Sequence, residues 1–209
     1  MDGVFFMRKW LKVLIFAVLF IAFVYMGSIA SDKKQLSNDI LRLHVVGASN
    51  SEEDQAVKLQ VRDAVLMAVE ELSVGVKNKE DAQKCLSENL SYLEQAANAV
   101  LAEQGFTQRA TVSLEKEEFP TRAYDTFSLP AGVYDSLRVT IGEGTGRNWW
   151  CVIFPSLCIP AASEKTAAVA AGGGLSDSLS GAITEREQYQ VRFFILDFLG
   201  RLENFFHRG

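Results

Sequence analysis

Two cysteines lie close together in the stretch NWWCVIFPSLC, residues 148–158 of a chain that has three cysteines and two histidines. A thiol activated by an imidazole is a nucleophile, so Cys151 or Cys158 with His44 as base would form the site of a thiol-dependent or hydrolytic enzyme. A Pro-Ser pair between the two cysteines can turn the chain, which would let their sulfurs form a disulfide instead. Both interpretations depend on the compartment in which the chain works.

Metal and nucleotide sites are not supported by the remaining motifs. The second histidine, His207, lies near the C-terminus, whereas a catalytic zinc normally has two or three imidazoles held close together. The glycine-rich GEGTG at 142–146 leads into an apolar segment and lacks the Lys-Ser/Thr and helix of a phosphate-binding loop. We therefore expect a hairpin turn there, with no metal ion and no cofactor.

A row of polar residues recurs every four positions at Asp54, Lys58 and Arg62, with Gln55 and Asp63 beside it. This spacing places them on one side of a helix. An ordinary solvated face with ion pairs worth about 0.3–0.5 kcal/mol each would give the same pattern. A contact surface for a partner is the functional alternative, and the spacing alone favours the solvated face.

The elements that position these residues follow from hydrophobic periodicity. An apolar strand ends at Gly47, and Asn50 or Ser51 can cap the helix that follows. A turn at 75–78 leads into a second helix, and later segments alternate with a period of two. The expected strands lie at 40–46 and within 107–119, 133–141 and 148–155, and the expected helices end near 72 and 104. This order predicts an α+β fold, with a two-helix hairpin packed on one face of a mainly antiparallel sheet of about four strands.

The first thirty residues differ in kind from the rest. Arg8, Lys9 and Lys12 precede the uncharged, apolar segment 13–30, which is the pattern that export machinery recognises. Small residues at Ser28 and Ala30 suit a signal peptidase. Residues 1–30 are therefore a cleaved signal peptide or an uncleaved membrane anchor, and either one places the remainder outside the cytoplasm. An oxidising compartment favours the Cys151–Cys158 bridge and leaves Cys85 unpaired.

The C-terminal part is predicted to be separate from the main domain at 36–160. An Ala-, Gly- and Ser-rich linker covers 161–183, and an amphipathic helix covers 184–207. One face of this helix carries Val191, Phe194, Phe198, Leu202 and Phe205. The helix could dock on the domain and fill its core, lie on a membrane surface, or insert into a groove of a partner. Docking is the plainest expectation.

The charge of the chain argues against one class of partner. The formal net charge is -5 and the sequence pI is about 5.2. Binding to nucleic acid needs a cluster of Lys and Arg that neutralises several phosphates, and no segment is dense enough in them. We therefore expect no nucleic-acid partner.

Two long segments resemble one known family. LRLHVVGASNSEEDQAVKLQVRDAVL at 41–66 and FPTRAYDTFSLPAGVYDSLRVTIGEGTGRNWWCVIFPSLC at 119–158, after a single N-terminal apolar segment, are similar to the stage II sporulation protein R family of endospore-forming bacteria. The resemblance covers roughly residues 36–160. It implies a signalling protein without catalytic residues, made in the forespore and exported to the space between the two septal membranes.

The same resemblance implies a partner. It would be the mother cell's membrane-embedded aspartic protease, which processes the precursor of sigma factor E, contacted at its extracytoplasmic face. We expect the contact surface on the polar side of the first helix and on the loop 119–134. The candidate residues are Asp54, Gln55, Lys58, Arg62, Asp63, Tyr124, Tyr134 and Trp149.

Overall fold

The computed structural model describes residues 14–21, 23, 24, 27, 34, 35, 37–123, 128–155 and 190–207. Several expectations lie outside these residues, so they stay predictions: cleavage after Ala30, the linker at 161–183, and any role of Tyr124 and Cys158. Within the described residues, no helix has the length and apolar character needed to cross a bilayer.

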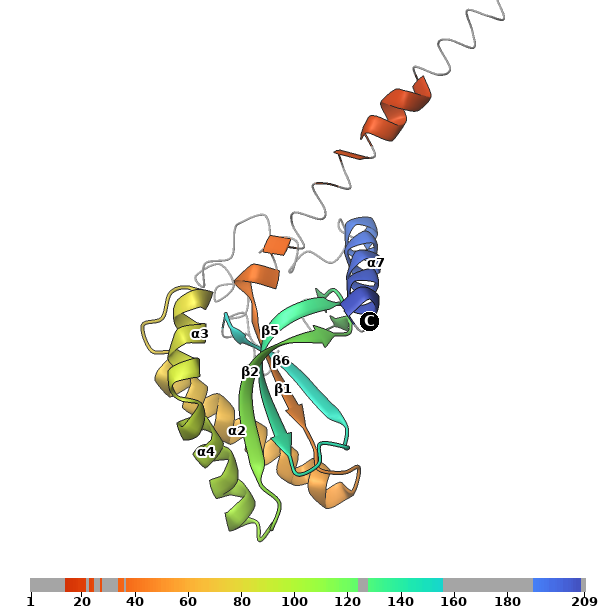
Figure 1. Ribbon diagram of the computed structural model, residues 1–209. Coiled ribbons are helices and arrows are strands. Elements are labelled where there is room, and N and C mark those ends of the chain that lie inside the picture. The colour runs from red at the N-terminus through yellow and green to blue at the C-terminus, as the bar shows by residue number, and fades with distance from the viewer. Residues whose placement is uncertain are drawn as a thin grey trace, which may run out of the picture.

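A four-stranded sheet forms the centre of the molecule (Figure 1). Its strand order is β2 (Ala110–Phe119), β5 (Gly132–Ile141), β1 (Leu41–Val46) and β6 (Asn148–Phe154). The pairs β2–β5 and β1–β6 are antiparallel, whereas β1 and β5 run parallel. The predicted α+β class with about four strands is confirmed. Most pairings are antiparallel, as expected, but the parallel pair β1–β5 makes the sheet mixed. The reason is that β1 lies between β5 and β6, which run in opposite directions, so it must be parallel to one of them.

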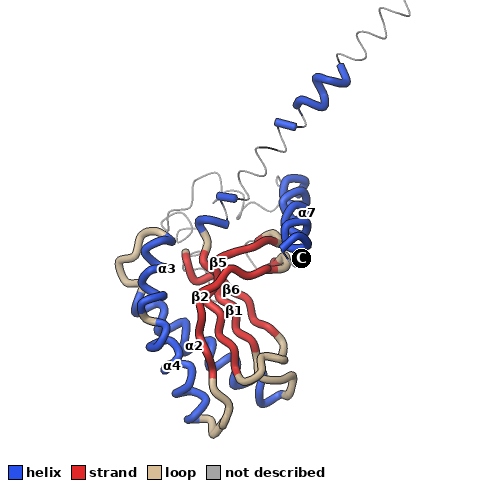
Figure 2. The backbone as a smooth tube through the Cα atoms, viewed as in Figure 1, coloured by secondary structure: helices blue, strands red, loops and turns tan. Residues whose placement is uncertain are grey.

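Three helices follow β1 and cover one face of the sheet (Figure 2). Helix α2 (Glu52–Leu72) is capped by Ser51, whose side chain accepts a hydrogen bond from the Asp54 amide at 3.1 Å. The single second helix that we expected is two helices, α3 (Lys79–Glu88) and α4 (Leu90–Glu103). They separate at Asn89, whose side-chain amide donates to the Cys85 carbonyl at 2.8 Å.

The main core lies between this helical layer and the sheet. Alternate residues of β1 face the helices, and the apolar stripes predicted for the helices meet them there. Fully buried members of this core include Leu41, Leu43, Val45, Val61, Val65, Leu93, Ala97, Leu137 and Val139.

A small hairpin lies between β2 and β5, where we expected only an irregular loop. It pairs β3 (Arg122–Ala123) with β4 (Ser128–Leu129) in antiparallel register. Arg122 of this hairpin places its guanidinium 3.9 Å from the centre of the Trp150 ring. The hairpin therefore contacts the face of the sheet that the helices leave open.

Helix α7 (Gln190–His207) packs against β5 and β2 (Figure 1). Asp197 accepts hydrogen bonds from the Ala131 amide and the Thr121 hydroxyl, and Asn204 donates to the Phe119 carbonyl at 3.2 Å. Gly200 lies so close to Ala131 that a Cβ there would overlap the Ala131 carbonyl. The helix docks on the domain through Asp197, Gly200 and Asn204. Three residues of the face that we expected to fill the core, Phe198, Leu202 and Phe205, are instead exposed.

A buried ion pair fixes the end of the sheet at which β1 begins, which we call the entry end. Lys79 of α3 is 6% exposed, and its Nζ lies 2.5 Å from an Asp135 carboxylate oxygen and 3.0 Å from the Ser37 carbonyl. Lys116 approaches the other carboxylate oxygen at 2.9 Å. Burial opposes ionisation of Asp135, but the bonds and charges of Lys79 and Lys116 outweigh it and hold the pKa of Asp135 below the usual value of 3.8.

This ion pair predicts a pH-dependent effect of Asp135→Asn. The substitution leaves the Lys79 ammonium buried without its anion, so we expect about 3 kcal/mol of destabilisation at neutral pH. A carboxylate whose pKa is depressed in the folded state stabilises the fold fully above its unfolded-state pKa. This stabilisation is lost as the pH falls through the folded-state pKa. The stability difference between wild type and variant should therefore narrow below pH 3.8.

Urea unfolding measured between about pH 7 and pH 2.5 would follow this difference. Glu143→Gln, at an exposed position in the turn after β5, is the control and should stay within about 0.5 kcal/mol of wild type. A stability difference that stays constant with pH would contradict the role assigned to Asp135.

Candidate functional site

Polar residues at the start of α2 bind the loop that follows β1. The Ser49 hydroxyl donates to Asp54 at 2.5 Å, and the Gln55 amide donates to the Ser49 carbonyl at 2.7 Å. Asp54 is only 8% exposed. The side chains expected to form a solvated row therefore turn inward at this end of α2, because each finds a backbone or hydroxyl partner in the loop.

Lys58 joins this loop to the turn between β5 and β6. Its ammonium donates to the side-chain oxygen Oε1 of Gln55 at 2.7 Å and to the Arg147 backbone carbonyl at 2.9 Å, and the residue is 4% exposed. Burial lowers the pKa of Lys58, and the positive charges of Arg147 and Arg62 lower it further. We call Asp54, Gln55 and Lys58 the loop clamp, since all three hold loops in place.

The GEGTG segment is the turn between β5 and β6, as its glycines indicated. Gly142 and Gly144 have φ of 56° and 63°, in the left-handed region that favours glycine. The Gly146 amide donates to the Gly47 carbonyl at 2.8 Å, and a Cβ at Gly146 would overlap the Ser49 carbonyl. The turn is thus packed directly against the loop after β1.

Three of the eight candidate residues meet at the surface where α2 passes β6. The Arg62 guanidinium lies 4.3 Å from the centre of the Trp149 ring, and it also pairs with Asp63 at 2.7 Å. Trp149 is 37% exposed, and Leu59, one turn before Arg62 on the helix, is 36% exposed. We call Leu59, Arg62, Asp63 and Trp149 the Trp149 surface.

Tyr134, another of the candidate residues, does not join this surface. Tyr134 is 1% exposed, and its hydroxyl donates to the Pro130 carbonyl at 2.8 Å. Its ring contacts Phe119 edge to face, with 5.9 Å between ring centres. Tyr134 therefore supports the loop 119–134 from inside.

The face of the sheet opposite the helices holds a buried polar and aromatic group that sequence reasoning missed. Glu117 Oε1 lies 2.9 Å from His44 Nδ1 and 2.7 Å from Arg138, and the His44 ring stacks on Trp150 at 5.6 Å. Burial opposes ionisation of Glu117. The hydrogen bond from His44, with the charges of His44 and Arg138, outweighs it and holds the pKa of Glu117 below its usual range.

This arrangement separates His44 from Cys151. In the β1–β6 register Cys151 pairs with Leu43 and Trp150 pairs with His44. Paired residues project to the same face and successive residues to opposite faces, so Cys151 lies on the helical side of the sheet and His44 on the other. The Cys151–His44 dyad considered from the sequence therefore cannot form in this fold.

Cys151 and Cys85 differ in their bonding. Cys151 is disulfide-bonded, whereas Cys85 is a free thiol whose Sγ donates to the Leu72 carbonyl at 3.2 Å. Cys158, the predicted partner of Cys151, lies outside the described residues. Among the described residues, no group of three or more His, Cys, Asp or Glu side chains is arranged to hold a metal ion.

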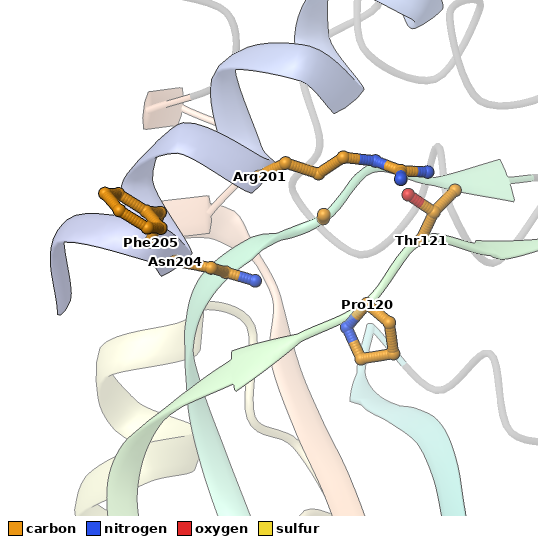
Figure 3. A pocket seen from close by; sticks show the side chains of 6 residues that line it. Pro120, Thr121, Arg201, Asn204 and Phe205 are labelled. Atoms are coloured by element: carbon orange, nitrogen blue, oxygen red, sulfur yellow. The ribbon is translucent and has the colours of Figure 1, made fainter. Parts of the chain in front are cut away.

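A pocket of about 400 Å³ lies where α7 meets the corner between β2 and β3 (Figure 3). Arg201 extends over Thr121, and Asn204 points toward the strands. The Arg201 guanidinium is paired with Asp197 at 2.8 Å, and Asp197 also accepts from Thr121. The charged groups at this pocket thus hold α7 in place. Its lining residues are Pro120, Thr121, Ala131, Arg201, Asn204 and Phe205.

Comparison with known proteins gives a consistent result. A family model described as Stage II sporulation protein R matches residues 37–164, which include the whole sheet and α2 to α4. The curated protein named Stage II sporulation protein R, from Bacillus subtilis (strain 168), is 29% identical over 160 residues, covering 73% of this chain and 71% of that protein. No solved structure matches the chain.

The loop clamp predicts that Lys58→Met destabilises the domain. Without the ammonium, the Arg147 carbonyl and the Gln55 side chain lose a partner in a buried place, at a cost of about 1–3 kcal/mol. Chemical denaturation would measure the loss. Arg62→Met, at the more exposed end of the same polar row, should cost under about 1 kcal/mol. Equal losses of stability for Lys58→Met and Arg62→Met would contradict the distinction between the loop clamp and the Trp149 surface.

Proposed function

Because the chain belongs to the Stage II sporulation protein R family, we propose that it is an exported sporulation signal that activates the membrane-embedded protease processing the precursor of sigma factor E. In this proposal the forespore makes the protein and exports it to the septal intermembrane space. The family match over residues 37–164 is the observation that carries the proposal. The basic and apolar N-terminal segment supports export.

The Trp149 surface is the contact that we propose for the protease. Tryptophan and arginine are the residues that most often dominate the energy of protein interfaces, and here they stack on one another at a partly exposed position. The surface also sits on a helix and a strand, so it is rigid before binding. The loop-clamp residues were also expected to contact the partner. Their side chains are engaged inside the domain, so in this proposal they position the Trp149 surface and do not touch the protease.

Activation by a binding protein sets a thermodynamic condition. The protein can activate the protease only if it binds the active arrangement, or the assembled state, more tightly than the inactive one. A rigid surface suits this role, since little of the binding energy is lost in ordering it. No chemical step by the signalling protein is required.

An extracytoplasmic thiol or hydrolytic enzyme was the alternative function. The simplest such enzyme would use Cys151 as nucleophile and His44 as base. The sheet register argues against it, because it places these two residues on opposite faces. The engagement of Cys151 in a disulfide points the same way, because a catalytic cysteine acts as a free thiolate.

Arg62→Glu tests the proposed contact. The substitution removes the stacking on Trp149 and reverses one charge, so we expect activation to fall about tenfold or more while the domain stays folded. The assay is co-expression of the chain with the protease and the sigma factor precursor in a non-sporulating host, followed by detection of the shortened factor.

The matched control for this variant is Met67→Glu, which adds a carboxylate at a 72% exposed position of the same helix, away from Arg62. It should leave cleavage unchanged. Normal cleavage with Arg62→Glu would remove the Trp149 surface from the proposal. If the wild-type chain, exported together with both other proteins, gave no cleavage at all, the proposed function itself would be wrong.

Replacing Cys151 and Cys158 with serine separates the signal from the thiol enzyme. If a bridge joins them, its loss should lower stability by about 2–4 kcal/mol. A signalling protein should still activate the protease at temperatures where the variant remains folded. Complete loss of activation by a variant that remains folded would favour a chemical role for the thiols.

A further inference from the structure

Helix α7 presents a continuous apolar stripe to solvent. The side chains of Phe198, Leu202, Phe205 and Phe206 are 53%, 40%, 73% and 77% exposed. Their spacing of four, three and one residues places them along one side of the helix. Three aromatic rings on one exposed stripe are far more than the isolated apolar side chains found on ordinary surfaces.

The helix cannot bury this stripe by rolling on the domain. Its other side is fixed by the hydrogen bonds of Asp197 and Asn204 and by the close approach of Gly200 to Ala131. Rotation would break these bonds and drive side chains into the Ala131 carbonyl. The stripe is therefore held outward.

The stripe lies at the entry end of the sheet, where the N-terminal segment joins the domain. The Ser37 hydroxyl donates to the Val133 carbonyl at 2.6 Å, two residues from the Ala131 that contacts α7. Figure 1 shows the helical residues 14–21 and α7 at this same end. Both apolar segments thus lie at one end of the domain.

The N-terminal segment sets how far a membrane can be from this end. The described side chains of this segment, at 14–21, 23, 24 and 27, are exposed, and those of Phe16 and Phe23 are 73% and 75% exposed. Ser37 follows Val24 by only thirteen residues, which span at most about 45 Å. Any bilayer that holds this segment is therefore within reach of α7.

From these observations we propose that α7 lies on a lipid bilayer, with Phe198, Leu202, Phe205 and Phe206 inserted at the boundary between headgroups and acyl chains. Amphipathic helices bind this region through their apolar face. The exposed charge of Arg201 is neutralised by Asp197, so apolar partition rather than attraction to anionic lipid drives the contact. The alternative is that the stripe inserts into a groove of another protein. No described segment of this chain would hold such a protein near α7 in the way that the N-terminal segment would hold a bilayer.

This contact has a consequence for the exported chain. Loss of residues 1–30 would remove the apolar N-terminal segment, yet α7 would still hold the domain at the membrane surface with the same end toward the lipid. The inference concerns the lipid contact alone and does not rest on activation of the protease.

The test is the depth of a fluorescent label in the full chain reconstituted in phosphatidylcholine vesicles. A cysteine replaces Phe206 in a Cys85→Ser background and carries the environment-sensitive dye NBD. We expect a blue shift of its emission and quenching by lipid that bears a doxyl group near the headgroup. A label at Glu103→Cys, an exposed site at the far end of α4, should show neither change.

A second variant separates insertion from mere proximity. Adding Phe205→Ser to the labelled chain should reduce the quenching at position 206, because the stripe loses a ring that is 73% exposed and so unimportant for folding. An unquenched label at 206, or equal quenching at 206 and 103, would overturn the proposal. Shielding of the 206 label that appears only when the extracytoplasmic part of the protease is added would overturn it in favour of a protein groove.

Discussion

Strand β1 is the constraint on which the other elements depend. All six of its residues are buried, and it is hydrogen-bonded on one side to β5 and on the other to β6. Since successive side chains point to opposite faces and all six are buried, both faces of the strand are covered. The helical layer covers one face, and Phe119 and Tyr134 cover Arg42 on the other, with the guanidinium 4.0 Å from the Phe119 ring centre. Phe119 and Tyr134 are thus part of the fold.

The alternation of side chains along β1 and β6 decides what chemistry the domain can perform. Leu43 and Cys151 lie on the helical side, whereas His44 and Trp150 lie on the other side. Neighbouring residues in the sequence therefore belong to different layers. The same alternation gives Trp149 and Trp150 different partners, Arg62 for the first and Arg122 with His44 for the second. The surface tryptophan and the packed tryptophan are consequences of a single register.

Local pattern was sufficient to predict most elements, because apolar periodicity reports directly which face of an element is buried. The helical stripe with Val57, Val61 and Val65 is one example. The parallel pairing of β1 with β5 could not be predicted this way, since it joins residues about ninety positions apart. The break at Asn89 was missed because the apolar spacing continues across it.

The candidate site shows a different limit of sequence reasoning. Residues four apart, such as Asp54 and Lys58, look like a solvated row, and only the fold shows that loops cover them. Gly47 and Gly146 were the available signals, because a missing side chain often marks a close approach of backbone. In α7 the aromatic residues were expected to be buried, but Gly200 makes the opposite side the one that fits against Ala131.

The two proposed surfaces lie at opposite ends of the same rigid sheet, which links their functions. Trp149 pairs with Val45, which pairs with Val139, eight residues beyond the Ala131 that contacts α7. Eight residues of a strand span about 25 Å. A domain held to a bilayer by α7 would therefore present Trp149 at about that distance from the lipid. Confinement with one orientation raises the effective concentration of such a surface for a membrane-embedded partner, as a short linker does between two binding sites. A modest contact area could then suffice for activation, because the membrane would supply part of the cost of bringing the two proteins together.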